Sequence, residues 1–355
     1  AGRSARSDAG RGRGGGIVNG RYSRQELFAG IGRDGQARLR QASVAIVGVG
    51  ALGSALGDMM VRAGVGAVRV IDRDFVEPSN LQRQTLFDEE DAAAGLPKAV
   101  AAERRLRALN SDVTVEGVVA DLGPDNAASL IGRASLVLDG TDNFETRFLL
   151  NDLCLREDVP WVYGACVGAY GLALAVRPRV SPCLRCLLEE MPAPGSGPTC
   201  DTVGVIGPIV HVVAGLQGGE ALKLLSGRAD TLLPGVVTID LWQGTFETMD
   251  LRGRAPWCPA CVDRRYDFLD ARSSSSATLC GRDAVQVRPE TAARLDLAAL
   301  AARLAPSGDV KANEYLVRFR APEAELVVFE DGRAIVKGVS EPARARSLYT
   351  KYVGS

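Results

Sequence analysis

The sequence predicts an α/β fold: a doubly wound, mostly parallel β-sheet with an antiparallel extension, followed by a small α+β module. Short apolar strands alternate with helices in the first half of the chain, which is typical of parallel strands joined by right-handed crossovers. A glycine-rich turn joins the first strand to its helix. Two cysteine pairs of equal spacing follow later in the chain, and they indicate a zinc knuckle that joins distant segments.

The glycine-rich turn follows an apolar strand at 43–47 and opens a helix that runs to residue 63. The turn consists of Gly48, Val49, Gly50, Ala51, Leu52 and Gly53. The first glycine permits a tight turn, the second lets the backbone approach a phosphate, and the third lets the helix pack on the strand. A second strand at 68–71 places Asp72 where a ribose hydroxyl is expected. This unit predicts a Rossmann-like nucleotide site, although a nicotinamide dehydrogenase would have the same pattern up to this point.

The segment after the second strand distinguishes between nucleotides. Its polar side chains are those of Asp74, Asn80, Arg83, Gln84 and Lys98. Lys98 begins a helix at 97–109, whose positive end would face the same crevice. Fixed positive charge beside a nucleotide is unfavourable unless an anion of several charges neutralises it. The pattern therefore favours ATP, and Arg83 and Lys98 disfavour the alternative of an NAD-dependent oxidoreductase.

A second group of polar residues follows a buried strand near 135–139, which comes after an expected strand at 113–119. Its loop carries Asp139, Asp142 and Asn143 ahead of a helix that reaches residue 156. Asp142 is suited to Mg²⁺, because that ion takes one or two carboxylates together with phosphate oxygens and water. The alternative is that Asp139 or Asp142 only caps the next helix.

Two Cys-x-x-Cys pairs predict one structural zinc site. The four cysteines are Cys183, Cys186, Cys258 and Cys261. Equal spacing in both pairs is typical of a tetrahedral site with four cysteine ligands, and four thiolates leave no open position for catalysis. Two disulfides are the competing interpretation, but the first twenty residues have no apolar core of a signal peptide, and cytosolic thiols stay reduced.

Strands are also expected at 160–163, 172–177 and 236–250, and the later strands should extend the sheet antiparallel and offer a surface to a partner. The single histidine, His211, lies in an apolar helix at 208–226 and is predicted to be a core residue. With it set aside, Ser-His and Cys-His hydrolase schemes lack their base.

Three further cysteines differ in their surroundings. Cys200 follows a glycine- and proline-rich stretch that predicts a mobile crossover loop. Cys154 and Cys166 have apolar neighbours and are expected to be buried packing residues.

We divide the chain into a disordered tail (1–20), a main domain (21–270), a linker (271–279) and a small module (280–355). The module should contain strands at 284–287, 314–319, 325–329 and 334–337, helices near 295–304 and at the end, and a hairpin turn at Asp331 and Gly332. Cys280 has no assigned role. The net charge of −1 argues against general nucleic-acid binding and against a polybasic membrane signal, and we expect a cytoplasmic protein.

Taken together with the segments 21–25 and 200–208, these motifs resemble the ThiF/MoeB family of ubiquitin-activating-enzyme-like adenylyltransferases, over residues 21–269. The resemblance implies that Arg83 and Lys98 contact the ATP phosphates, with Asn80 and Gln84 on the phosphate side. It also implies that Asp72 binds the ribose and Asp142 binds magnesium.

The resemblance implies roles for two more residues. Arg24 would reach across a homodimer interface to the γ-phosphate of the partner, or alternatively it forms a surface salt bridge. Cys200 would attack the acyl-adenylate or join the carrier through sulfur, as in some family members, whereas in others this cysteine is dispensable.

The implied reaction is adenylation of the C-terminal Gly-Gly carboxylate of a ubiquitin-like sulfur carrier, with release of pyrophosphate. A carboxylate with a pKa of about 3.5 is already ionised and needs no general base. Some relatives carry a rhodanese-like domain, for which the tail is too short, so a cysteine desulfurase or rhodanese would donate sulfur in trans. A tRNA-base dehydratase of the same superfamily and an inactive scaffold are alternatives, and the carrier, for thiamine, molybdopterin or another pathway, stays open.

Overall fold

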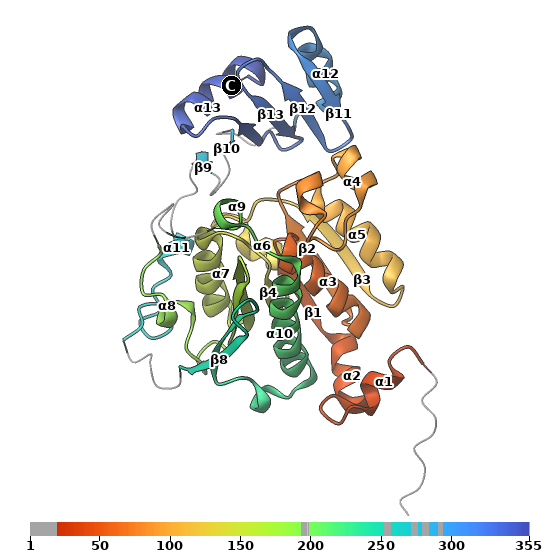
Figure 1. Cartoon of the computed structure of the whole chain (residues 1–355), viewed down its shortest axis with the longest axis vertical. Helices are drawn as coiled ribbons and strands as arrows, with labels where there is room; N and C mark the ends of the chain where they lie inside the picture. Colours follow the sequence, from red (N-terminus) through yellow and green to blue (C-terminus); the bar gives the residue numbers. More distant parts are fainter. Residues whose placement is uncertain are drawn as a thin grey trace, which may run out of the picture.

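The computed structural model describes residues 20–192, 197, 199–251, 257–270, 276–278, 284–289 and 294–354. Expectations for the tail at 1–19, for most of the linker and for Cys280 fall outside these residues. The described chain forms a main domain around an eight-stranded sheet and a C-terminal module around a six-stranded sheet (Figure 1).

The main sheet has the strand order β3-β2-β1-β4-β5-β6-β7-β8. Strands β3 to β5 are parallel, and β6, β7 and β8 extend the sheet antiparallel, as predicted. The bounds are β1 Ser43–Val47, β2 Ala67–Asp72, β3 Thr114–Val119, β4 Leu136–Asp139, β5 Trp161–Val167, β6 Tyr170–Val176, β7 Gly235–Asp240 and β8 Thr245–Asp250. The order reverses between β1 and β4, and ligands bind in such sheets at the carboxyl ends around this reversal.

Helices cover both faces of this sheet. On one face lie α3 (Ala51–Ala63), α5 (Lys98–Leu109) and α10 (Gly207–Ser226), and on the other lie α6 (Ala127–Ile131) and α7 (Phe144–Glu157). In β1, Val44 and Ile46 join the first core, whereas Ala45 and Val47 join the second. Successive side chains of a strand point to opposite faces, so a strand covered on both sides is apolar throughout.

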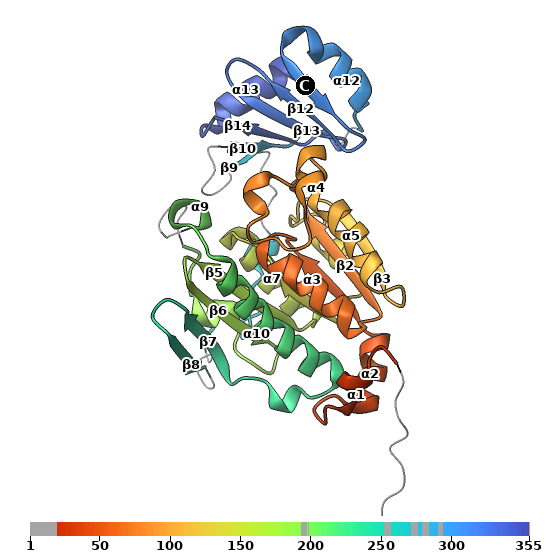
Figure 2. The same cartoon turned by 45° about the vertical axis from the view of Figure 1, so that its right-hand side comes forward.

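Shorter elements complete the main domain. They are α1 Ser23–Leu27, α2 Gly32–Gln41, α4 Glu89–Ala94, α8 Leu184–Leu187, α9 Cys200–Val203, α11 Asp267–Asp270 and the 3-10 turns η1 Pro78–Asn80 and η2 Ala229–Thr231. Figures 1 and 2 place α1 and α2 at the end of the domain remote from the C-terminal module, and α4 beside it.

The module is an antiparallel sheet of order β11-β12-β13-β14-β10-β9 with two helices on one face. Its elements are β9 Ser276–Thr278, β10 Ala284–Val287, α12 Leu297–Leu304, η3 Ala305–Ser307, β11 Asp309–Ala312, β12 Leu316–Arg320, β13 Glu325–Phe329, β14 Ala334–Lys337 and α13 Pro342–Tyr352. The hairpin between β13 and β14 turns at Gly332, with φ +81°, as predicted. The sequence missed β11 and β9, and β9 lies within the expected linker because it is fixed by pairing with β10, which a local pattern does not reveal.

The prediction that His211 is a core residue is wrong. His211 is exposed on α10, together with Gly215 and Gly219 one and two turns later. The helix is apolar on most sides, but only one of its faces packs on the sheet, and residues four apart share a face. Among the described residues, we find no helix with the length and apolar character that crossing a bilayer requires.

Candidate nucleotide site and cysteine cluster

The glycine turn after β1 packs directly on the loop after β4. Gly48 has φ +83°, and a Cβ added there would lie 2.7 Å from the carbonyl oxygen of Gly140. A Cβ on Gly53 would lie 1.8 Å from the carbonyl oxygen of Gly48. Gly50 differs, because its added Cβ would meet only the Gln84 Nε2 atom, at 3.8 Å. The first and third glycines therefore serve close packing, while the second leaves space beside the backbone.

Asp72, at the end of β2, holds this turn in place. Its Oδ2 accepts a hydrogen bond from the Val49 N–H at 2.6 Å, and its Oδ1 accepts one from the Asp74 N–H at 2.7 Å. Burial raises the pKa of the Asp72 carboxyl, and the charge of Lys98 opposes that effect. Asp72 thus lies where a ribose would be expected, but it already orders the glycine turn.

Lys98 and Asp74 form the charged pair of the site. The Lys98 Nζ atom lies 3.4 Å from the Asp74 Oδ2 atom, and the Lys98 side chain is 4% exposed. The Lys98 N–H donates to the Asp74 carbonyl at 2.9 Å, beside a bridge between Phe75 and Pro97. The positive charge that favoured a polyphosphate in the sequence therefore has a carboxylate partner within the chain.

The segment between this pair holds the predicted amides and arginine. The Asn80 Oδ1 atom accepts from the Glu77 N–H at 3.1 Å. The Arg83 Nη1 atom donates to the Ser79 carbonyl at 2.9 Å. Gln84 is 3% exposed, and within the described part of the chain its Oε1 atom has no hydrogen-bond partner. Its amide lies beside Gly50, so a buried polar group borders the open side of the glycine turn.

The loop after β4 contains a buried ion pair and an exposed carboxylate. Asp139 is fully buried, and its Oδ2 atom lies 3.6 Å from the Arg147 Nε atom. Burial raises the pKa of Asp139 to about 6, against the opposing charge of Arg147. Asn143 is the N-cap of α7, with its Oδ1 accepting from the Thr146 N–H at 2.8 Å. The helix-capping alternative for Asp139 and Asp142 is therefore wrong, and the Asp142 residue is exposed at the carboxyl edge of the sheet.

Cys200 opens the short helix α9 instead of lying in an irregular loop. Residues 193–196 and 198, which carried the prediction of a mobile crossover, lie outside the described residues. The Cys200 Sγ atom donates to the Cys166 carbonyl at 3.4 Å. Cys154 is buried as predicted, whereas Cys166 is half-buried at the end of β5. Burial raises the pKa of the Cys166 thiol to about 12, with a smaller contribution from Cys200.

The knuckle cysteines, which are the four cysteines of the two Cys-x-x-Cys pairs, lie close together, as predicted, although the two pairs are far apart in sequence. Their sulfur atoms all lie within 4.8 Å of one another. Neighbouring sulfurs are separated by 3.9, 3.6 and 3.5 Å. Tetrahedral zinc with bonds of about 2.3 Å would require sulfur separations of about 3.8 Å, so the cluster fits such an ion.

Two side chains of α7 hold the segments that carry these cysteines. The Asn151 Oδ1 atom accepts from the Leu184 N–H, next to Cys183, at 3.0 Å. The Asp152 Oδ2 atom accepts from the Phe268 N–H at 3.0 Å. The cysteine cluster is thereby anchored to the main domain from both of its segments.

The structure places Arg24 away from the other residues predicted for the nucleotide site. It is exposed on α1, at the end of the domain remote from the carboxyl edge of the parallel strands (Figure 1).

Comparison with known proteins identifies the domain. The model of the ThiF family matches residues 22–260. The chain belongs to the ThiF family. It is 47% identical over 342 residues to the sulfur carrier protein ThiS adenylyltransferase of Bacillus subtilis, covering 95% of this chain and 100% of that protein. It is 40% identical over 250 residues to the SAMP-activating enzyme E1 of Haloferax volcanii, covering 70% of this chain and 91% of the other.

Solved structures support the fold assignment of the ThiF domain. The crystal structure of E. coli MccB with ATP aligns at a TM-score of 0.59 and 22% identity, covering 70% of this chain and 76% of that chain. At this identity the similarity concerns the fold alone.

Two residues that support the ThiF site were missed from the sequence. Gly140 packs against the glycine turn, because its added Cβ would lie 2.3 Å from the Gly48 carbonyl oxygen. Gln217 of α10 donates through Nε2 to the carbonyls of Asp139, at 2.8 Å, and Val162, at 3.1 Å. A glutamine in a mostly apolar helix was the available signal. In the structure, a Cβ on Gly164 would lie 2.3 Å from the Gln217 side chain.

Proposed function

We propose that this protein adenylates the C-terminal Gly-Gly carboxylate of a ubiquitin-like sulfur carrier, using ATP and releasing pyrophosphate. The observation that carries the proposal is the convergence of the glycine turn, Lys98 and Asp142 at the carboxyl edge of a ThiF-type sheet. The similarity to a sulfur carrier adenylyltransferase over 95% of the chain supports the same substrate class.

The residues suit a reaction that depends on positioning and charge. The open backbone at Gly50 and the cations Arg83 and Lys98 would hold the polyphosphate, and Asp72 would meet the ribose. Asp142 would hold Mg²⁺, which takes few protein ligands when phosphate oxygens supply the rest. A carboxylate of the carrier then attacks the α-phosphorus, the bond to the β-phosphate oxygen breaks, and pyrophosphate leaves. Asn80, Gln84, Asp74 and Asn143 line this edge.

Cys200 would act after adenylation. Its thiol lies beside Cys166, at the end of the strand next to β4. We propose that it attacks the acyl-adenylate carbonyl and displaces AMP, giving a thioester to the carrier. Sulfur would then come from a cysteine desulfurase or rhodanese in trans, in the cytoplasm, where thiols stay reduced.

The antiparallel extension offers an apolar surface for the carrier. Trp242, in the turn between β7 and β8, is 79% exposed, Phe246 is 59% exposed and Tyr170 is 40% exposed. The register pairs Tyr170 with Asp240 and Asp240 with Thr245, so these residues gather near the turn from β5 to β6. That turn lies next to Cys166, so a carrier docked there would have its C-terminus close to the nucleotide site.

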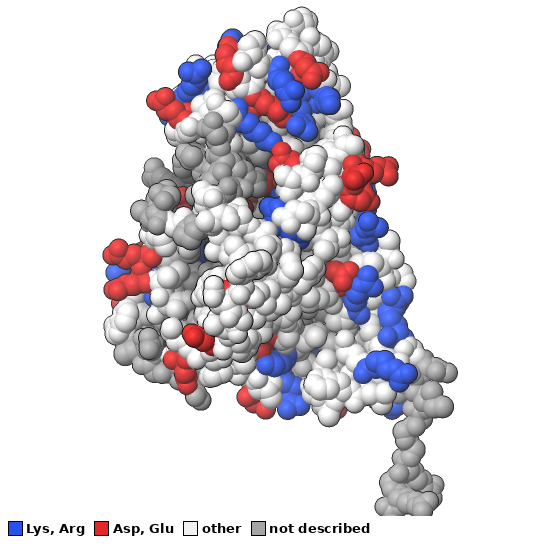
Figure 3. Space-filling model, viewed as in Figure 1, with Lys and Arg blue, Asp and Glu red and all other residues white. Residues whose placement is uncertain are grey.

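We further propose a homodimer in which Arg24 completes the partner's nucleotide site. Arg24 is exposed, and two apolar residues beside it, Leu27 and Phe28, are 66% and 65% exposed. The surface around α10, which carries His211, is largely uncharged in Figure 3. Exposed apolar and uncharged surfaces of this kind are typical of interfaces. The knuckle cysteines would hold a structural zinc ion in each chain.

Carrier-dependent exchange of pyrophosphate into ATP tests the reaction. Exchange should require both the protein and a carrier that ends in Gly-Gly, and a carrier lacking the final glycine is the matched control. Cys200→Ala should retain exchange, because adenylation precedes any thiol chemistry. Exchange that is equally fast with the truncated carrier, or absent with every Gly-Gly carrier supplied, would contradict the proposal.

A further inference from the structure

The C-terminal module packs on the segment that follows β2, next to residues of the proposed nucleotide site. Phe75, next to Asp74, is 3% exposed and shares an apolar cluster with Leu316, Phe329 and Ile335 of the module. The Lys337 Nζ atom lies 4.8 Å from the centre of the Phe75 ring and 2.5 Å from the Glu77 Oε1 atom. One face of the module's sheet is covered by its own helices, and the other is covered by the main domain (Figure 2).

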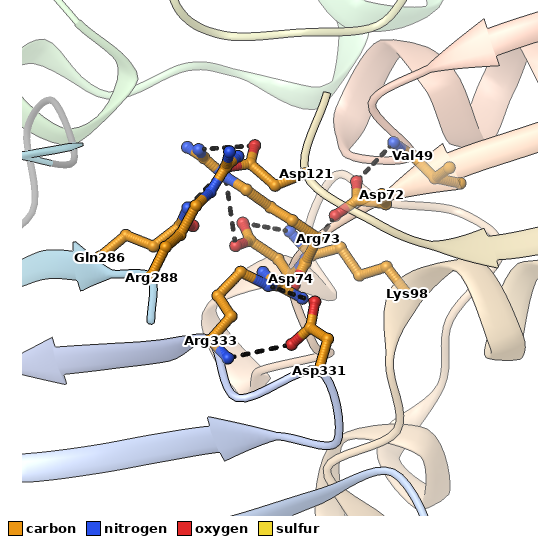
Figure 4. Close-up of polar contacts among 10 residues, drawn as sticks. All are labelled: Val49, Asp72, Arg73, Asp74, Lys98, Asp121, Gln286, Arg288, Asp331 and Arg333. Atoms are coloured by element: carbon orange, nitrogen blue, oxygen red, sulfur yellow. Dashed lines mark hydrogen bonds and ion pairs between the residues drawn. The ribbon is translucent and has the colours of Figure 1, made fainter. Parts of the chain in front are cut away.

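A buried arginine of the module reaches the backbone between Asp72 and Asp74. The Arg333 Nη1 atom donates to the Arg73 carbonyl at 2.9 Å (Figure 4). Arg333 is 2% exposed, and its guanidinium lies 3.9 Å from the centre of the Phe329 ring. Burial lowers the pKa of Arg333, and the nearby Asp331 carboxylate opposes that effect. Burying a guanidinium is costly unless it is paired, and one of the two partners of Arg333, the Arg73 carbonyl, belongs to the main domain.

The side chain of Arg73 is held by the same module through Asp121. The Arg73 Nη1 atom lies 3.1 Å from the Asp121 Oδ1 atom. From the module, Gln286 donates to the Asp121 Oδ2 atom at 2.5 Å, and Arg288 forms an ion pair with the same oxygen (Figure 4). Burial alone would raise the pKa of Asp121, but Arg73 and Arg288 hold it below its usual value. Asp121 therefore joins cations from both parts of the chain.

The residues on either side of Arg73 order the nucleotide site. Asp72 accepts from the Val49 N–H in the glycine turn at 2.6 Å. Asp74 pairs with Lys98 at 3.4 Å. A shift of Arg73 would move both anchors, so contacts of Arg333 and Asp121 with Arg73 act on the glycine turn and on Lys98 together.

We propose that Arg333, with the Arg288–Asp121–Arg73 bridge, positions the Asp72–Asp74 loop for ATP, so that the C-terminal module is a working part of the nucleotide site. This inference rests on the proposed function for its reaction. In the structure, the module would set the affinity for ATP through its contacts with Arg73.

Two variants of the full chain test the inference. Arg333→Lys keeps the charge but lacks the planar fork that fixes the Arg73 carbonyl. Asp121→Asn breaks the bridge from the main-domain side and leaves the module's own residues unchanged. Arg320→Lys is the control, because that side chain is 69% exposed on the same sheet and pairs with Glu325.

Isothermal titration with ATP and Mg²⁺, without carrier, measures the effect directly. Both test variants should bind ATP roughly three- to tenfold more weakly, as expected for one lost hydrogen bond. The KM for ATP should rise by the same factor, while the KM for carrier stays constant. Hydrogen exchange should become faster in residues 72–80 but not around the knuckle cysteines. If the module only stabilised the fold, the variants would lower the melting temperature without a selective rise in the KM for ATP.

The outcomes separate the inference from the proposed function. If both test variants bind ATP as tightly as wild type, the inference is overturned, whatever the reaction. If wild type binds ATP, the variants bind it more weakly, and no carrier is adenylated, then the inference stands for the nucleotide site and the proposed reaction fails. If wild type binds no ATP, both fail.

Discussion

At the residue scale, charged groups of the proposed nucleotide site have partners within the chain. Lys98 pairs with Asp74, and Arg147 pairs with the buried Asp139. Such pairs fix the side chains in place, so little reorganisation is needed when charge develops on a phosphate. Asp142 is exposed at the same edge and is not the cap of α7. We therefore propose Asp142 as the carboxylate that would hold Mg²⁺ beside the phosphates.

Asp142→Asn should lower carrier-dependent pyrophosphate exchange by about 100-fold, the scale for losing one electrostatic contact to the transition state. The fold should be unaffected, since Asn143 caps the following helix. Exchange rates and melting temperatures check this, with the exposed Glu145→Gln on the same helix as control. Normal exchange by Asp142→Asn would remove Asp142 from the site.

At the element scale, the cysteine cluster joins two segments that lie 75 residues apart in the sequence. The four sulfur atoms lie within 4.8 Å, and α7 holds both segments through Asn151 and Asp152. A structural zinc ion can contribute about 10–16 kcal/mol of apparent binding free energy to such a unit, so the metal should matter for stability and not for chemistry.

Cys258→Ser should release the metal and lower the melting temperature by more than about 5 °C, because three remaining ligands bind zinc poorly. Metal content per chain and thermal unfolding check both effects. Cys280→Ser, at a cysteine outside the predicted cluster, is the control and should keep its metal. Full metal content in Cys258→Ser would contradict the shared site.

At the scale of the whole molecule, two features lie outside the carboxyl edge of the main sheet. The module covers the loop after β2 through Phe75 and Arg333. Arg24 lies on α1 at the opposite end, where it cannot serve the site of its own chain (Figure 1). The proposed active unit is therefore a dimer in which each site combines a module-braced loop with an arginine of the other chain.

Mixing two impaired variants tests the dimer. Arg24→Ala and Asp142→Asn should each retain little activity alone. Their co-expressed mixture should recover about a quarter of wild-type activity, because half of the dimers are mixed and each has one intact site. Exchange assays on the purified mixture check this, and the double variant in one chain is the control. No recovery in verified mixed dimers would place Arg24 outside the partner's site.

The sequence by itself determined the order of the main-domain strands along the chain, the glycine turn at Gly48 and the pairing of the cysteine motifs. These follow from local periodicity, turn chemistry and metal-ligand spacing, which neighbouring residues suffice to specify. Only the tertiary structure decided which helix face is covered, so His211 proved exposed. Only the tertiary structure also shows that β9 pairs with β10 and that Arg333 contacts Arg73. Those contacts join residues distant along the chain, and their burial depends on packing that no local pattern encodes.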